Sequence, residues 1–231
     1  MIIKVENKTK NFESYRAQRV KSLFNAEDGS QFVNEFNIEI DDLDWGIGLI
    51  VGASGSGKTS IGKQFFGENK ICNLYANWEH DKPIIDCILP NGAFDSATGA
   101  LAAVGLGDVP SWLRPFHVLS NGQQFRAGLA RLVTEAPNEV VVDEFTSVVD
   151  RQIAKIGALA FSKSWRKNKG KKVVLLSCHY DIIEWLQPDW VYDVNTKVLK
   201  KKLNSGTDQK SKLTFGRSTE LSGSFLKSIT I

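Results

Sequence analysis

The chain has 231 residues, of which 42% are hydrophobic and 24% are charged, and its formal net charge is +3. These values fit a soluble globular protein with a substantial core, built as one large domain or as a core with small appendages. They exclude a chain that is basic throughout, and no apolar run approaches the roughly 20 residues that a membrane-spanning helix needs.

The first part of the chain is predicted to be mostly β-strand. Residues 1–46 contain short alternating segments such as 36–40, separated by turns, which are typical of antiparallel strands. The apolar run IGLIV at 47–51 predicts a strand that leads into a glycine-rich loop, and a helical pattern follows at 57–66. A further short strand is expected at 71–76. This order of strand, loop and helix is the frame in which the first motif appears.

The second part predicts helices first and then strands and helices in alternation. Residues 83–118 are interrupted by Gly and Pro and are expected to be helical in pieces, while 125–136 has the pattern of an amphipathic helix. The remaining elements are buried strands at 139–145 and 172–179, a helix between them at 151–167, a hairpin at 191–203 and a polar linker at 204–212. Alternating strands and helices indicate an α/β protein with a mostly parallel central sheet.

We therefore expect an α/β domain over residues 1–203, with a small helical subdomain at about 83–136, and a separate basic segment at 204–231. Residues 197–231 hold eight Lys or Arg and two Asp or Glu, whereas the rest of the chain holds 21 and 24. This basic end is interpreted as a solvated hairpin and linker, or as a weak patch for a phosphate backbone or an anionic surface.

The cysteines and the first residues bear on the compartment. Cys72, Cys87 and Cys178 are odd in number and match no metal-binding spacing, which favours buried, reduced thiols in a reducing compartment. The first twelve residues lack the apolar stretch of a secretory signal. We expect a cytoplasmic protein that another chain would have to recruit to any membrane.

The strongest motif is GASGSGKT at 52–59, which fits the pattern G-x-x-x-x-G-K-[ST]. Glycines let backbone N–H groups turn toward phosphate oxygens, and the N-terminus of the following helix favours an anion. Lys58 supplies a positive charge for the terminal phosphates, and the Thr59 hydroxyl is a ligand for Mg²⁺. The predicted nucleotide-binding residues here are Gly52, Ala53, Ser54, Gly55, Ser56, Gly57, Lys58, Thr59 and Ser60.

A second motif, LSNGQ at 119–123, opens the predicted amphipathic helix. Ser120 is a good N-terminal cap, and Gly122 is expected to expose the backbone. The plain interpretation is a capped helix and nothing more. The other interpretation is a second anion site, because a helix N-terminus with a free hydroxyl and bare N–H groups attracts phosphate.

Acidic and imidazole side chains follow the two later strands. Asp143 ends the apolar run VVVD and can hold Mg²⁺ through water, while Glu144 can orient or deprotonate an attacking water. His179 ends the next apolar strand, at the same edge of a parallel sheet, where a contact with the γ-phosphate is favoured over a purely structural role. For Asp143 and Glu144 the plain interpretation is a solvated turn.

The order of these motifs resembles the ABC-type (ATP-binding cassette) ATPase family over about residues 30–195. GASGSGKT is similar to its Walker A motif, LSNGQ to its LSGGQ signature with Asn121 in place of a glycine, and VVVDE to Walker B with the catalytic Glu144. SVVD at 147–150 resembles the D-loop, and His179 the switch histidine. The fold implied is that of a P-loop NTPase with a mostly parallel sheet, an N-terminal antiparallel β segment and a small helical subdomain.

The resemblance also implies an assembly and an activity. In this family two domains dimerise head to tail, so that the signature of one copy caps ATP held by the other. Ser120 and Gly122 would contact the γ-phosphate in trans, and Asp150 would lie at the subunit interface. ATP and Mg²⁺ are the implied ligands, with Thr59 and Asp143 as the metal-binding residues, and the implied activity is ATP hydrolysis.

The chain departs from transporter members of the family in one motif. Such members carry a Q-loop glutamine between Walker A and the signature, but here the only glutamine between them is Gln64, on the predicted P-loop helix. Glu79, His80 or Asp81 could substitute for it. The aromatic residue that stacks on adenine is either Phe24 or Phe32, with core packing as the alternative for both.

Three functions follow in order of preference. The first is a stand-alone ATPase that dimerises on ATP and acts as a soluble switch on a nucleic acid or an effector protein. The second is the ATP-binding subunit of a membrane transporter, against which the missing Q-loop glutamine argues. The third is a module that holds ATP without turnover, against which the intact Glu144 and His179 argue.

Overall fold

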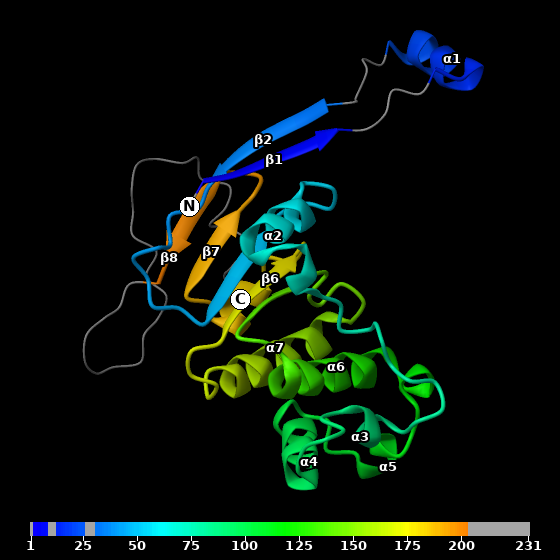
Figure 1. Ribbon diagram of the computed structural model, residues 1–231, viewed down its shortest axis with the longest axis vertical. Coiled ribbons are helices and arrows are strands. Elements are labelled where there is room, and N and C mark those ends of the chain that lie inside the picture. Colours follow the sequence, from blue (N-terminus) through cyan, green and yellow to red (C-terminus); the bar gives the residue numbers. More distant parts are fainter. Residues whose placement is uncertain (1, 9–12, 26–30, 203–231) are drawn as a thin grey trace. The chain divides into compact units, whose positions relative to one another are not determined.

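The computed structural model describes residues 2–8, 13–25 and 31–202, which leaves the predicted linker and C-terminal segment outside the described residues (Figure 1). The strands are β1 (Ile2–Lys8), β2 (Gln31–Asn37), β3 (Ile47–Val51), β4 (Ile71–Cys72), β5 (Glu139–Val142), β6 (Lys172–Ser177), β7 (Trp190–Asp193) and β8 (Val198–Lys201). The α-helices are α1 (Tyr15–Phe24), α2 (Lys58–Phe66), α3 (Ile84–Cys87), α4 (Phe94–Ala103), α5 (Val109–Trp112), α6 (Asn121–Glu135), α7 (Arg151–Trp165) and α8 (Ile182–Leu186), and the 3₁₀ helices are η1 (Glu68–Lys70) and η2 (Phe116–Val118).

The central sheet has six strands in the order β4-β5-β6-β3-β7-β8. All neighbours pair in parallel except β7 and β8, which form the predicted antiparallel hairpin. Every residue of β3 is buried. Such continuous burial, without alternation, is expected of a parallel strand covered on both faces, so the predicted α/β class with a mostly parallel sheet is confirmed.

Two hydrophobic clusters cover the two faces of the sheet. On one face, Ile61 and Phe65 of α2 pack with Ile50 of β3, together with Phe36 and Ile38 at the end of the N-terminal hairpin. On the other face, buried residues of α4, α6 and α7 pack with the strands; they include Leu101, Leu129 and Phe161. Helix α2 and the glycine-rich loop 52–57 that precedes it are therefore anchored to the middle of the sheet.

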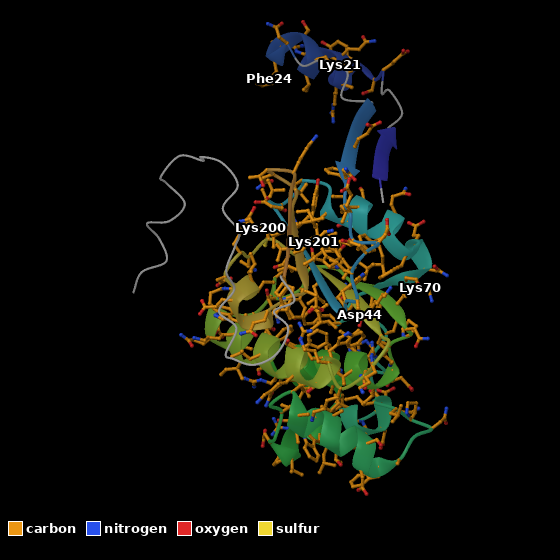
Figure 2. The ribbon with its side chains drawn as sticks, turned by 90° about the vertical axis from the view of Figure 1, so that its left-hand side faces the viewer. Lys21, Phe24, Asp44, Lys70, Lys200 and Lys201 are labelled. Atoms are coloured by element: carbon orange, nitrogen blue, oxygen red, sulfur yellow. The ribbon has the colours of Figure 1, made fainter. Side chains whose placement is uncertain are left out.

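The N-terminal β segment is confirmed in outline, but it contains a helix that the sequence pattern did not predict. Strands β1 and β2 pair antiparallel, and α1 lies between them in the chain. Ser14 caps α1, yet no residue of α1 is buried, and Phe24 is 75% exposed (Figure 2). The sequence did carry signals for this helix, namely the Ser14 cap and the helical spacing of Val20, Leu23 and Phe24, but the segment was interpreted as part of the strands.

The predicted strand at 71–76 is wrong beyond its second residue. Strand β4 ends at Cys72, because the side chain of Asn73 accepts a hydrogen bond from the backbone of Tyr75 at 2.9 Å and turns the chain. Asparagine often ends strands in this way, since its side chain competes for backbone N–H groups. The short helix α8 was also not predicted.

A helix that spans a bilayer must be both long and apolar. None of the helices in the described part of the chain meets both conditions.

Helix α6 approaches the backbone of residue 74 so closely that only glycine fits at position 128. A Cβ on Gly128 would lie 2.9 Å from the carbonyl oxygen of Leu74 and 2.8 Å from its Cβ. Gly128→Ala is therefore expected to destabilise the protein by about 1–3 kcal/mol, although alanine is the better helix former by about 1 kcal/mol.

The matched control for this substitution is Gly99→Ala in the interior of α4, where an added Cβ meets nothing within 4 Å. It is expected to raise the free energy of unfolding by about 0.5–1 kcal/mol. Urea denaturation of the two variants checks both signs. A Gly128→Ala protein as stable as the parent would show that the α6 contact with residue 74 is looser than described.

Candidate functional site

The loop GASGSG at 52–57 connects β3 to α2 at the carboxyl end of β3, and Lys58 is the first residue of α2. Gly55 and Gly57 have φ values of +76° and +92°, and an added Cβ would meet nothing within 4 Å at either position. These are left-handed conformations that glycine adopts without strain. The open space beside them means that the two glycines are needed for the path of the chain and for close approach of a ligand rather than for packing.

The polar groups of this loop are arranged for an anion. The Lys58 Nζ donates hydrogen bonds to the carbonyl oxygens of Gly52 at 2.9 Å and of Ala53 at 2.7 Å. The Ser56 Oγ is buried and has no hydrogen-bond partner, which is unusual for a buried hydroxyl. A folded-back lysine, an unpartnered hydroxyl and the start of α2 together fit a phosphate group.

Three strand ends bring the predicted catalytic residues to the same edge of the sheet as this loop. Strands β5, β6 and β3 are neighbours in parallel, so the residues that follow them lie along one edge. Asp143 and Glu144 follow β5, and His179 lies two residues beyond the end of β6. The structure therefore places these predicted site residues on loops of adjacent strands, the arrangement in which α/β proteins bind ligands.

The loop after β5 has a strained backbone. Glu144 and Thr146 have φ values of +54° and +67°, and Thr146 is 1% exposed. Positive φ is unfavourable for residues other than glycine, above all for a β-branched one, and such strain gathers at functional sites. The Asp143 carboxylate accepts a hydrogen bond from the Glu144 N–H at 2.9 Å, which fixes the turn, while the Glu144 side chain is exposed.

Sequence reasoning missed two neighbours of His179. The Thr146 Oγ1 lies 3.5 Å from the His179 Nδ1, and Arg151 forms a two-point ion pair with Asp181 beside it. Burial, and then the charge of Arg151, lower the pKa of His179 below its ordinary value of 6.5, and Asp181 opposes them. His179 is thus held in its neutral form, in which one ring nitrogen donates and the other accepts.

The surroundings of His179 predict how its pKa responds to the loss of Arg151. Arg151→Gln removes a positive charge and leaves Asp181 unopposed, so the pKa of His179 should rise toward or above 6.5. In the parent protein the folded-state pKa is depressed, so stability from neutral His179 is present above pH 6.5 and is lost as the pH falls below it. NMR titration of the His179 ring protons checks the shift. An unchanged pKa in Arg151→Gln would remove Arg151 as a cause.

The signature residues lie at the start of α6, where Ser120 directly precedes the first helical position. Ser120 and Gln123 form a complete capping box, and the Gln123 Nε2 also donates to the Ser111 Oγ at 2.7 Å. Gly122 does not expose the backbone as predicted. It is buried against α7, where an added Cβ would lie 2.6 Å from the Ile153 Cδ1. Gly122 therefore packs against the Ile153 side chain of α7 within the chain.

The remaining predicted interface residue, Asp150, caps α7. Its carboxylate accepts hydrogen bonds from the N–H groups of Gln152 at 2.9 Å and Ile153 at 3.0 Å. Among the hydrogen bonds of the described residues, none joins Ser120, Gly122 or Asp150 to the phosphate loop. Thus the chain gathers the loop, Asp143, Glu144 and His179 at one edge, while the signature and D-loop residues serve as helix caps and packing positions.

The segment that stands where a Q-loop is expected is anchored by an aromatic residue. Trp78 stacks on Phe116 with ring centroids 4.3 Å apart, and Arg131 lies 4.1 Å above the Trp78 ring. Glu79, one of the three substitutes considered, is exposed and pairs with Lys82 at 2.9 Å. Gln64 lies on α2, as predicted, and it is exposed. This segment is thus attached to the helical region by stacking.

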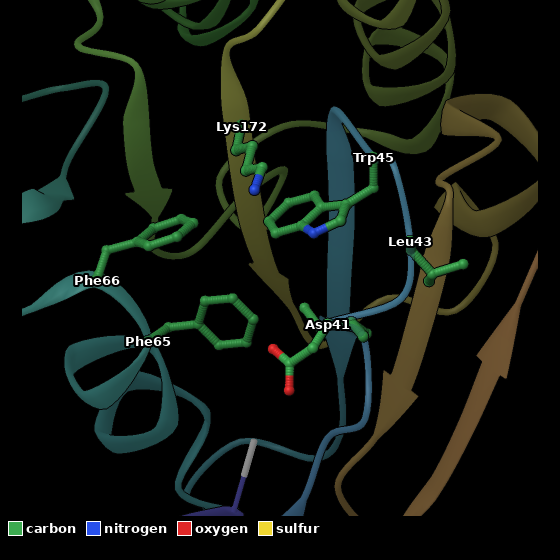
Figure 3. Close-up of a pocket in the computed structure, with 7 residues that line it drawn as sticks. Asp41, Leu43, Trp45, Phe65, Phe66 and Lys172 are labelled. Carbon is green, nitrogen blue, oxygen red and sulfur yellow. The ribbon is translucent and has the colours of Figure 1, made fainter.

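The two aromatic candidates for adenine are not tested equally. Phe24 is on the exposed helix α1, whereas the side chain of Phe32 is outside the described residues. A cavity of about 200 Å³ is lined by aromatic side chains, but it lies between the end of α2, Trp45 and the first residue of β6, Lys172 (Figure 3). That is the amino edge of the sheet, opposite the phosphate loop.

Two further predictions concern the cysteines and the basic end of the chain. All three cysteines are free, but they are not buried as predicted: Cys72 and Cys87 are half-buried, and Cys178 is exposed. In the part of the basic end that the structure describes, Lys201 pairs with Asp42 at 2.8 Å. One of its positive charges is therefore already balanced within the chain.

No family model matches the chain. It is 23% identical over 216 residues to the energy-coupling factor transporter ATP-binding protein EcfA1 of Leuconostoc mesenteroides, a match that covers 78% of each chain. It is also 38% identical over 66 residues to the methionine import ATP-binding protein MetN 2 of Acinetobacter baylyi, over 29% of this chain and 19% of that protein.

Solved structures agree with the fold. The dimeric post-hydrolysis structure of the ATP-binding cassette MJ0796 bound to ADP and Pi matches with a TM-score of 0.56 and 16% identity, over 84% of this chain and 94% of that one. A second dimeric structure of MJ0796, described as a bacterial ABC transporter cassette, matches with a TM-score of 0.54, 18% identity and the same coverage. The comparisons confirm the resemblance to ABC-type ATP-binding cassettes and the predicted α/β fold with a mostly parallel sheet.

Proposed function

We propose that this chain binds ATP with Mg²⁺ at the loop 52–60 and hydrolyses it, and that two copies act together head to tail. The observation that carries the proposal is the gathering of the loop, Asp143, Glu144 and His179 at one edge of the sheet. Mg²⁺, held by Thr59 and Asp143, would neutralise charge on the terminal phosphates.

Each residue has a role that its surroundings support. Gly55 and Gly57 let backbone N–H groups approach the phosphates, and Lys58 exchanges the carbonyl oxygens of Gly52 and Ala53 for phosphate oxygens. Glu144 is exposed on a turn fixed by Asp143, so it is free to accept a proton from water. His179, kept neutral, donates a hydrogen bond to the γ-phosphate.

The dimer follows from what one copy lacks. Ser120 lies at the exposed start of α6, with no hydrogen bond to its own phosphate loop among the described residues. A second copy in head-to-tail orientation would bring its Ser120 and the N-terminus of its α6 to the γ-phosphate side of the nucleotide. The two dimeric structures of the cassette MJ0796, which has a similar fold, support a dimer of this chain.

The biological role that the relatives favour is the ATP-binding subunit of a membrane transporter. Both curated relatives carry names of transporter ATP-binding proteins. The order of preference drawn from the sequence is therefore reversed, and the soluble switch becomes the second candidate. One observation still favours the switch: the only glutamine between Lys58 and the signature is Gln64, on the exposed side of α2.

The experiment that separates the two is recovery of the full chain, with an affinity tag, from its native cells. A transporter subunit should be found with the membranes and should co-purify with an integral membrane protein, with stimulated ATPase activity in that complex. A chain recovered only from the soluble fraction, and stimulated by a nucleic acid or a soluble protein, would instead support the switch.

A further inference from the structure

A row of hydrogen bonds joins the phosphate loop to residues that the proposed function does not use. The N–H of Ala53 donates to the Asn195 Oδ1 at 3.5 Å, and the Asn195 Nδ2 donates to the Tyr180 hydroxyl at 3.2 Å. The Tyr180 hydroxyl in turn donates to the Asp193 Oδ1 at 3.1 Å. The row thus starts in the loop after β3 and ends at the last residue of β7, passing through the residue after His179.

The direction of each hydrogen bond is fixed by chemistry. The Asp193 carboxylate can only accept, so the Tyr180 hydroxyl must donate its hydrogen to it. The hydroxyl oxygen of Tyr180 then accepts the hydrogen bond from the Asn195 amide. Burial, and then the charge of Asp193, raise the pKa of Tyr180, so its hydroxyl keeps its proton. Asp193 also accepts from the N–H groups of Asn195 at 2.9 Å and Thr196 at 3.4 Å. An amide at 195 and a hydroxyl at 180 are both required for the row to be complete.

Backbone contacts also join the start of the phosphate loop to the turn that follows β7. The N–H of Val194 donates to the carbonyl of Val51 at 2.9 Å, and a Cβ on Gly52 would lie 3.1 Å from the Val194 Cβ. The loop therefore leaves β3 directly against the turn that follows β7. The residues at this contact, Gly52 and Ala53, are also those whose carbonyl oxygens accept from Lys58.

We propose that Tyr180, Asp193 and Asn195 form a positioning relay that fixes the Gly52–Ala53 end of the phosphate loop against the segment carrying His179. The inference rests on the proposed function, because it assigns these residues to ATP binding and turnover. None of the three touches ATP in this account. They act through Ala53, which sets where Lys58 rests, and through Tyr180, which sets where His179 lies.

The test compares Asn195→Ala, Tyr180→Phe and the double variant with the parent protein. Each single change removes two hydrogen bonds of the row, one of which is the shared bond between Asn195 and Tyr180. We therefore expect kcat/KM for ATP to fall about 10-fold, as misplacement of reacting groups does. The kcat/KM of the double variant should be no lower than that of the weaker single variant, because each single change already interrupts the row of hydrogen bonds. Asn195→Asp keeps the acceptor for Ala53 but replaces the donor to Tyr180 with a negative charge close to Asp193 and the phosphate loop, so its kcat/KM should also fall below that of the parent protein.

The matched control is Tyr192→Phe on β7, which removes a buried tyrosine's hydroxyl one residue before Asp193 and should leave kcat/KM unchanged. Thermal unfolding of every variant separates positioning from general destabilisation, since a positioning role lowers kcat/KM at an unchanged Tm. Additive losses in the double variant, or parent-like kinetics in Asn195→Ala, would overturn the relay. A parent protein without ATP binding would instead overturn the proposed function.

Discussion

Lys58→Ala is expected to weaken ATP binding by a factor on the order of 100, because a charge-assisted contact to phosphate is lost and nothing of like charge replaces it. The ammonium of Lys58 already lies over the loop, held by the carbonyl oxygens of Gly52 and Ala53 at 2.9 and 2.7 Å. Isothermal titration of the variant with Mg-ATP measures the loss directly.

The control for this variant is Lys63→Ala on the same helix, α2. Lys63 is exposed and pairs with Glu68, so removing it should cost less than about 1 kcal/mol of stability and leave ATP affinity as in the parent protein. If Lys58→Ala bound ATP within about threefold of the parent, the loop 52–60 would not be the nucleotide site, and the functional proposal would fail at its first step.

Glu144→Gln is expected to keep ATP binding and to lower kcat by about 10²–10⁴-fold, the usual contribution of a general base. The amide retains the size and the polar contacts of the side chain but cannot accept a proton from water. The strained turn should survive the change, because it is the Asp143 carboxylate that accepts the Glu144 N–H. Steady-state kinetics and nucleotide titration on one preparation measure the two effects together.

Glu139→Gln is the matched control, since Glu139 is exposed at the opposite end of the same strand, β5. It should leave both kcat and ATP affinity unchanged. Turnover at the parent rate in Glu144→Gln would show that another group activates the water, and the assignment of Glu144 would be wrong.

The parts of the fold that could be predicted from the sequence are those with a strong local signal. Strand β3, the glycine loop and α2 were placed correctly because an apolar run, a phosphate motif and a helical pattern stand next to one another. Helix α1 was missed because the segment around it was interpreted as strands, although the spacing of Val20, Leu23 and Phe24 is helical. Strand β4 was predicted too long because its end depends on one asparagine side chain.

The residues of the candidate site also differ in whether a local sequence signal identifies them. Residues of ordered motifs, such as Lys58, Asp143 and Glu144, are recognisable from the sequence alone. Residues such as Arg151 and Asn195 are not, because their contacts join segments far apart in the chain: Asn195 lies 142 positions from Ala53. Gly122 was interpreted wrongly for a related reason, since its neighbour on α7 is not visible from the helix start alone.

We expect a second copy of the chain to complete the nucleotide site, and light scattering measures whether two copies associate. Glu144→Gln, purified alone, should be a monomer of 25.6 kDa without nucleotide and should roughly double in mass with Mg-ATP. That result would show that Ser120 can serve the site of a partner copy. A protein that binds ATP and stays a monomer would contradict the homodimer, and a different subunit would then have to complete the site.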